Sequence, residues 1–103
     1  MSLKKQFLKS KPVCKVSFTV DKEESLGANT IGLLGEFNNW NTAEPVVMKK
    51  FKNGSFKVTI DLPVNQEYQF KYLLNGENWI NDGAADKYVN SGLGAEENSV
   101  VSL

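Results

Sequence analysis

Histidine is absent from this 103-residue sequence, which removes the side chain that most often serves as a general base or a metal ligand. Its absence also excludes nucleophile pairs such as Ser–His and Cys–His. The single cysteine, Cys14, can form neither an internal disulfide nor, by itself, a zinc site. Cys14 alternates with Val16, Phe18 and Val20, so we expect it in the core. We therefore expect neither a metal nor a cofactor.

Net charge and long apolar runs are lacking as well. Twelve basic and twelve acidic residues cancel, so no overall field attracts nucleic acid or a membrane surface, and the balance favours an uncharged ligand. No window approaches the roughly 18 apolar residues of a membrane span. Residues 1–11 are basic but lack the apolar stretch of a signal peptide. We expect a cytoplasmic protein without nucleic-acid or membrane partners.

A facing pair of carboxylates, the requirement of most glycosidases, is not evident in the sequence. Such pairs stand roughly 5 to 10 Å apart across the substrate. Glu23-Glu24 and Glu96-Glu97 are sequence neighbours in expected loops, and neighbours on an extended chain point to opposite sides. The sequence therefore predicts a protein that is not an enzyme, and a small glycosidase is the weakest of the readings kept open.

The sequence does contain many short segments with the period of β-strands. Its composition, 41% hydrophobic and 11% aromatic, is sufficient for one small core. Apolar residues alternate with polar ones, or form short continuous runs, between turn residues. Strands are expected at 13–20, 30–34, 46–51, 56–62, 68–74, 77–81 and 99–103. With no convincing helix, these seven strands predict an all-β antiparallel sandwich over 13–103, preceded by a flexible arm at 1–12.

Turn residues divide these strands. Asn53-Gly54 predicts a hairpin with a two-residue type I′ turn, because both positions must take positive φ angles. Asn75-Gly76 is a second turn of the same composition. The charged segment 21–29 is expected to be a loop, and 82–98, rich in Gly, Ala, Asn and Asp, is expected to be a long loop of the kind that is often functional.

Two tryptophans stand where loops are expected. Trp40 lies in Gly35-Glu36-Phe37-Asn38-Asn39-Trp40-Asn41, a polar turn segment that follows an apolar strand and offers no obvious core to fill. Trp79 lies beyond the second turn. Exposed flat rings suit the C–H face of a sugar, with amide and ammonium groups nearby for its hydroxyls. Two other interpretations remain: tryptophans at the rim of the core, and a hot spot for a protein partner.

The Trp40 segment is followed in order by three further motifs and by a C-terminal segment: Asn53-Gly54-Ser55-Phe56, Tyr68-Gln69-Phe70-Lys71-Tyr72-Leu73-Leu74-Asn75-Gly76, Trp79 with Asn81-Asp82, and Leu93-Gly94-Ala95-Glu96-Glu97-Asn98-Ser99-Val100-Val101. Over residues 13–103 this order resembles that of the family 48 carbohydrate-binding modules. The family includes glycogen-binding domains of AMP-activated kinase β subunits and the N-terminal domains of isoamylases and branching enzymes.

The resemblance implies a fold, a ligand and a set of binding residues. The fold is an immunoglobulin-like (early-set) β-sandwich, and the function is non-catalytic binding of α-1,4-linked glucans such as glycogen, starch and maltooligosaccharides. Trp40 and Trp79 would stack on glucose units, Lys71 and Asn98 would hydrogen-bond them, and Leu93 would insert into the groove of the glucan helix. A glycan-metabolising enzyme is implied as a further partner.

The sequence departs from the family pattern at three places. The last loop is one residue longer, so that Glu97 or Ser99 competes with Asn98 for the position of the binding asparagine. Ala95 replaces a threonine, and Asp82-Gly83 replaces Asp-Pro. The alternative function, from another class, is an immunoglobulin-like domain that binds a glycan-metabolising enzyme and no glycan of its own.

Overall fold

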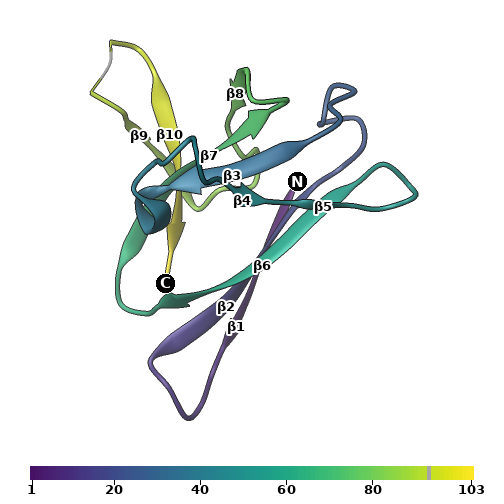
Figure 1. The fold of residues 1–103 in the computed structure, drawn as a ribbon. Coiled ribbons are helices and arrows are strands. Elements are labelled where there is room, and N and C mark those ends of the chain that lie inside the picture. Colours follow the sequence, from purple (N-terminus) through teal and green to yellow (C-terminus); the bar gives the residue numbers. More distant parts are fainter. Residues whose placement is uncertain (93) are drawn as a thin grey trace.

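Two antiparallel β-sheets pack face to face in the computed structural model, which describes residues 1–92 and 94–103 (Figure 1). This arrangement confirms the predicted all-β antiparallel sandwich. The four-stranded sheet has the order β1-β2-β6-β5, and the six-stranded sheet has the order β4-β3-β7-β10-β9 with β8 paired to β7. The elements are β1 (Ser2–Phe7), β2 (Val13–Val20), β3 (Ile31–Gly35), the 3₁₀ turn η1 (Glu36–Asn38), β4 (Val46–Val47), β5 (Lys49–Lys50), β6 (Phe56–Pro63), β7 (Glu67–Leu74), β8 (Asn78–Ile80), β9 (Lys87–Asn90) and β10 (Glu97–Ser102).

The core lies between the sheets and is built from the alternating apolar positions of β2, β6 and β7. The rings of Phe18 and Phe70 meet edge to face across the core, with centroids 5.1 Å apart. Val58 and Ile60, predicted in the core, lie half-buried at its margin. The other predicted core residues are buried: Cys14, Phe18, Val20, Phe56, Phe70 and Tyr72.

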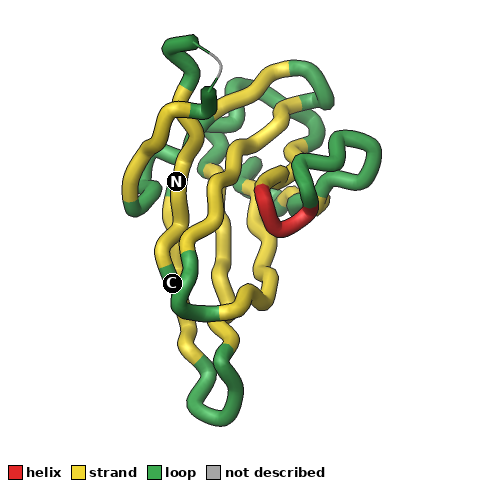
Figure 2. The backbone as a smooth tube through the Cα atoms, turned by 90° about the vertical axis from the view of Figure 1, so that its left-hand side faces the viewer, coloured by secondary structure: helices red, strands yellow, loops and turns green. Residues whose placement is uncertain are grey.

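The predicted flexible arm is wrong for residues 2–7, which form β1 and pair with β2 from Ser2↔Thr19 to Phe7↔Cys14. Leu3 packs against the core from this strand. Lys5 stands on the same side as Leu3, and its ammonium reaches Asp86 at 2.7 Å. A lysine on the inward side interrupts the apolar alternation, which is why periodicity did not reveal the strand. The hairpin of β1 and β2 projects beyond the sandwich in two views (Figures 1 and 2).

The single strand predicted at 46–51 is divided between the two sheets. β4 pairs with β3 in the six-stranded sheet, and β5 pairs with β6 in the four-stranded sheet. Met48, between them, is buried, and its N–H donates to the carbonyl of Ile31 at 2.9 Å. The chain crosses from one sheet to the other at this residue and closes that side of the sandwich.

The two Asn-Gly turns differ in structure. At the second, Asn75 (φ 53°) and Gly76 (φ 70°) both take left-handed angles, as a two-residue hairpin turn requires. At the first, only Gly54 does (φ 88°), and the N–H of Phe51 donates to the carbonyl of Ser55 at 2.8 Å around a three-residue loop. The predicted type I′ turn there is therefore wrong, and Asn53 acts through its side chain, which accepts the N–H of Ser55 at 3.0 Å.

The long loop predicted at 82–98 contains β9, and β10 is an inner strand rather than the closing edge. β10 pairs with β7 on one side and with β9 on the other. Figure 1 shows the β9–β10 hairpin at the same end of the molecule as β8. The hairpin therefore enlarges the six-stranded sheet beside the strand that carries Trp79.

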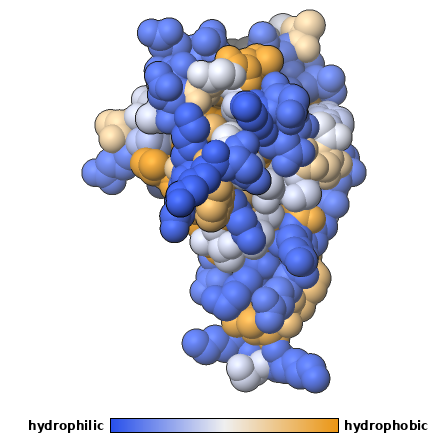
Figure 3. Space-filling model, turned by 90° about the vertical axis from the view of Figure 1, so that its right-hand side faces the viewer, coloured by the Kyte–Doolittle hydropathy of each residue, from blue (hydrophilic) through white to orange (hydrophobic). Residues whose placement is uncertain are grey.

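The face shown in Figure 3 is mostly hydrophilic, with small and separate apolar patches. Among residues 1–92 and 94–103, the structure contains no helix with the length and hydrophobicity needed to cross a membrane.

Candidate functional site

The outer face of the six-stranded sheet contains a hollow of about 650 Å³. Four of the five predicted site residues line it, namely Trp40, Lys71, Trp79 and Asn98. Leu93, the fifth, lies outside the described residues. The hollow has the volume of a small-ligand site. Residues from four separate segments of the sequence therefore meet at one place. The complete lining of described residues is Trp40, Lys71, Trp79, Ser91, Glu96 and Asn98.

Strand register explains why three of these side chains share one face. On β7, Phe70 and Tyr72 are buried in the core, so Lys71 between them points outward. Ser99 pairs with Phe70, which places Asn98 on the same face as Lys71. Trp79 pairs with Leu73, two residues beyond Lys71 and on its face. β7, β8 and β10 therefore supply one side chain each.

Trp40 reaches the hollow from the segment after β3, whose short helix is red in Figure 2. The backbone of Gly35 lies against β7, and a Cβ at this position would stand 2.5 Å from the carbonyl oxygen of Gln69. Glu36 fixes the same contact, because its Oε1 accepts the N–H of Gln69 at 2.7 Å. The Phe37 ring lies 6.3 Å from the ring of Phe18 at the edge of the core. Three consecutive residues thus dock the loop onto the sheet.

The remaining residues of the loop turn the chain back on itself. Asn38 accepts the N–H of Gly35 at 3.0 Å and donates to the carbonyl of Glu44 at 3.4 Å. Asn39 and Trp40 both adopt left-handed angles (φ 56° and 54°), which are unfavourable for a residue as large as tryptophan. The N–H of Trp40 donates to the carbonyl of Gly35 at 2.9 Å. These bonds hold Trp40 in a conformation that directs its ring toward β8.

The two indole rings lie at an angle to each other. Their centroids are 6.4 Å apart and their planes differ by 63°. Trp79 is 43% exposed, whereas Trp40 is half-buried. Trp79 is thus an exposed ring. Trp40 is intermediate between the two possibilities considered from the sequence, an exposed ring and a ring that covers the rim of the core. The rings form two walls of the hollow rather than one flat surface.

Polar groups complete the hollow beside the rings. The Nζ of Lys71 lies 3.4 Å from Oε2 of Glu96, and the Lys71 side chain is only 12% exposed. Its methylene stem is therefore covered, and the ammonium is held at the surface. The Asn98 amide donates to Oε1 of Gln69 at 3.0 Å, which fixes its orientation. Each of these polar groups is thus held by a neighbour.

Sequence reasoning missed two residues of the lining, Ser91 and Glu96. They stand at the two ends of the turn between β9 and β10, where the N–H of Ser91 donates to the carbonyl of Glu96 at 2.9 Å. Only a prediction of β9 would have shown that this turn folds back toward Lys71.

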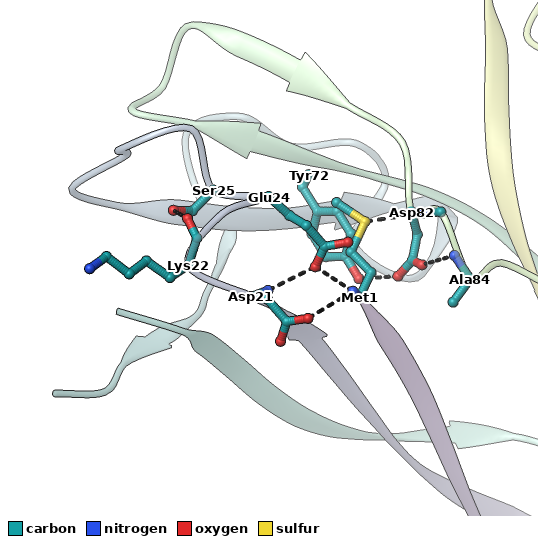
Figure 4. Close-up of polar contacts among 9 residues, drawn as sticks. Met1, Asp21, Lys22, Glu24, Ser25, Tyr72, Asp82 and Ala84 are labelled. Atoms are coloured by element: carbon teal, nitrogen blue, oxygen red, sulfur yellow. Dashed lines mark hydrogen bonds and ion pairs between the residues drawn. The ribbon is translucent and has the colours of Figure 1, made fainter. Parts of the chain in front are cut away.

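A buried polar cluster supports the segment that follows Trp79. The Tyr72 hydroxyl donates to Oδ2 of Asp82 at 2.5 Å, and the N–H of Ala84 donates to Oδ1 at 2.7 Å (Figure 4). The N–H of Asp82 donates to Oγ of Ser99 at 2.8 Å, and that hydroxyl donates to Oδ1 of Asn81 at 2.8 Å. Burial, reinforced by the charge of Asp82, raises the pKa of Tyr72 well above its ordinary value. The cluster joins β7, β10 and the end of β8 behind the hollow.

The hollow offers stacking surfaces and hydrogen bonds rather than reactive groups. Of the described residues that line it, Glu96 alone carries a carboxylate, and Lys71 is beside it. A glycosidase requires two carboxylates across its substrate. Within the described part of the chain, no group of three or more His, Cys, Asp or Glu residues is placed to hold a metal ion.

Comparisons with known proteins match most of the chain to one family. The family described as the glycogen recognition site of AMP-activated protein kinase matches residues 16–99. The β-2 subunits of 5′-AMP-activated protein kinase from Mus musculus, Rattus norvegicus and Homo sapiens are each 32% identical over 76 residues, or 74% of this chain. The alignment covers 26% of each subunit, so the chain spans about a quarter of these relatives.

A solved structure shows the same fold. The enterobactin esterase FES of Shigella flexneri superposes with a TM-score of 0.71 at 14% identity, over 98% of this chain and 32% of the esterase chain. At this identity the likeness concerns the fold alone. The family match covers most of the chain, and the chain therefore belongs to the family of glycogen recognition domains found in AMP-activated protein kinase.

Proposed function

We propose that this domain binds α-1,4-linked glucans, such as glycogen, starch and maltooligosaccharides, and performs no catalysis on them. Trp40 and Trp79 stack on glucose units, while Lys71 and Asn98 bond their hydroxyl groups. Leu93 is proposed to insert into the groove of the glucan helix. The glycan-metabolising enzyme and the cytoplasmic location expected from the sequence stay predictions.

The angle between the two indole rings is the observation that supports this proposal most. A flat pair of rings would suit a flat, extended ligand, whereas walls inclined by 63° suit a ligand that curves between them. α-1,4-linked glucose chains curve, because the linkage turns successive rings. The C–H faces of two glucose units can then meet one indole each, with their hydroxyl edges turned toward Lys71 and Asn98.

Calorimetric titration with maltoheptaose and β-cyclodextrin tests this function. Borrowing the value for bases stacked on aromatic rings, each tryptophan contributes roughly 1 to 3 kcal/mol. Trp79→Ala is thus expected to lose most of the affinity. Because the ring is 43% exposed, the melting temperature should hardly change.

Phe7→Ala is the matched control, since Phe7 is 56% exposed and lies on the four-stranded sheet, away from the hollow. It should bind both sugars like the wild type. A wild-type domain that binds neither sugar would contradict the proposal. It would favour the alternative in which the exposed rings contact a partner protein.

A further inference from the structure

Glu96 occupies a position that folding alone does not explain. Its side chain is 68% exposed, yet its carboxylate stands 3.4 Å from the ammonium of Lys71 at the hollow. An ion pair this exposed contributes roughly 0 to 1 kcal/mol to stability. The carboxylate is therefore available for a ligand that enters the hollow.

Hydrogen bonds link the described residues on the two sides of the turn that carries Glu96. The N–H of Ser91 donates to the carbonyl of Glu96 at 2.9 Å, which closes the hairpin. Within the turn, the amide of Asn90 donates to the carbonyl of Gly94 at 3.0 Å, and the N–H of Gly92 donates back to Oδ1 of Asn90 at 2.7 Å. The backbone of Glu96 is thus bonded within the hairpin, and its side chain reaches from there to Lys71 on β7.

Lys71 and Glu96 have complementary hydrogen-bonding capacities. An ammonium only donates, and an ionised carboxylate only accepts. Because the two groups are only 3.4 Å apart, hydroxyl groups on neighbouring carbons of one sugar ring can reach both of them. One hydroxyl of such a pair can accept from Lys71 while the other donates to Glu96, and bonds of this kind to charged groups are stronger than neutral ones.

We propose that Glu96 is a further sugar-binding residue, which accepts a hydrogen bond from one hydroxyl of a vicinal pair while Lys71 donates to the other. The inference rests on the glucan-binding function proposed above and defines its ligand class more narrowly. Glu96 balances the charge of Lys71 and repels a phosphate group, so the site selects glucans whose neighbouring hydroxyls are free and uncharged.

Variants of Glu96 and of its neighbour Glu97 test the role of the carboxylate. Glu97 makes the same change in net charge, does not line the hollow, and contacts Asn81 only through its backbone carbonyl. Glu96→Ala is expected to weaken β-cyclodextrin binding about tenfold, a factor that corresponds to about 1.4 kcal/mol, and Glu96→Gln to weaken it by a smaller factor. Glu97→Ala and Glu97→Gln should bind as the wild type does.

The direction of the change separates a ligand contact from simple charge balance. If Glu96 only neutralised Lys71, its removal would free the ammonium and binding would stay equal or become tighter. A Glu96→Ala domain that binds β-cyclodextrin as well as the wild type therefore overturns the inference and leaves the proposed function intact. A wild-type domain that binds neither β-cyclodextrin nor maltoheptaose overturns both.

Binding of a charged ligand distinguishes a direct contact of Glu96 with the sugar from a purely structural role. Compared with the wild type, Glu96→Gln should lose affinity for maltoheptaose but gain affinity for a maltoheptaose that carries a phosphate ester. Structural damage would lower the affinity for both ligands together. Equal losses for the two sugars would overturn the proposed selectivity.

Discussion

Trp40 is directed into the hollow by neighbours that have no contact with the ligand in the proposed function. Its left-handed backbone (φ 54°) is unfavourable for a large residue, and the preceding Asn39 shares this conformation. The hydrogen bond that Asn38 accepts from the N–H of Gly35, and the docking of Gly35 and Glu36 on β7, compensate for this cost. Asn38 and Asn39 therefore help to position the ring, which explains why two asparagines directly precede it.

Gly35→Ala should disturb this arrangement, because the new methyl group would stand 2.5 Å from the carbonyl oxygen of Gln69 and 2.8 Å from the Phe37 ring. We expect a loss of roughly 1 to 3 kcal/mol in unfolding free energy, the usual cost of overpacking, together with weaker glucan binding. Gly83→Ala is the control, since a Cβ there meets nothing within 4 Å. Urea denaturation and sugar titration of both variants decide the matter, and equal behaviour would contradict this role of Gly35.

Lys71→Met retains the covered stem of the side chain and removes its donor. We expect glucan binding to weaken by about 1.5 to 3 kcal/mol, the range for a hydrogen bond to a charged group. Stability should change little, because the partner carboxylate of Glu96 is exposed and becomes hydrated. Calorimetry and a thermal melt measure the two effects separately. Unchanged affinity would mean that Lys71 does not bind the sugar.

At the scale of elements, the buried cluster of Tyr72, Asp82 and Ser99 connects β7 and β10 with the segment that follows β8. Tyr72→Phe removes one donor from the buried Asp82 carboxylate, so we expect a loss of roughly 1 to 3 kcal/mol. Tyr68→Phe is the comparison, because the Tyr68 hydroxyl donates to a neutral carbonyl, that of Pro63, at 2.8 Å. A smaller loss for Tyr68→Phe is expected in urea denaturation. The opposite order would contradict the importance of the charged partner.

The same cluster predicts a dependence of stability on alkaline pH. Burial and the charge of Asp82 raise the pKa of Tyr72 above its ordinary value, so the native state keeps a proton that an unfolded tyrosine loses above about pH 10. The contribution of the Tyr72 hydroxyl to the free energy of unfolding is fully present below that pH, and it decreases as the pH rises above it. Wild-type stability should therefore fall more steeply between about pH 9 and pH 11 than that of Tyr72→Phe. Parallel curves would contradict this assignment.

The periodicity of the sequence correctly predicted the strands whose two faces differ most in burial. β2 spans Val13–Val20, as predicted, and β6 and β7 depart from their predicted bounds by a single residue at one end. The edge strand β1 was missed because the inward-facing Lys5 interrupts its apolar alternation, and β9 was missed because it is only four residues long and largely exposed. The division of the strand predicted at 46–51 into β4 and β5 was missed as well. It depends on the pairing of each half with a different sheet, which no local pattern shows.

The candidate site was predictable only in part. Trp40, Lys71, Trp79 and Asn98 were named from motif order, and the structure brings all four together. Glu96 was considered from the sequence only as half of a catalytic carboxylate pair with Glu97, and its approach to Lys71 was missed, because that approach depends on the β9–β10 turn, which no local pattern in the sequence reveals.

At the scale of the whole molecule, charge balance constrains the ligand. The formal net charge is zero and the cation in the hollow, Lys71, faces a carboxylate. A neutral glucan releases no counterions, so its affinity should be nearly the same at roughly 50 and 200 mM salt. Titration with maltoheptaose at both concentrations measures this. A steep loss of affinity with salt would indicate an anionic ligand instead.

The most direct test of glucan binding at this hollow is nuclear magnetic resonance of the labelled domain. The sequence contains two tryptophans and therefore gives two indole N–H signals. On titration with maltoheptaose, both signals and the amides around Lys71 and Asn98 should shift and saturate together, while β1, β2 and β6 in the other sheet stay unchanged. Unmoved indole signals, or shifts centred on the four-stranded sheet, would contradict the proposed site.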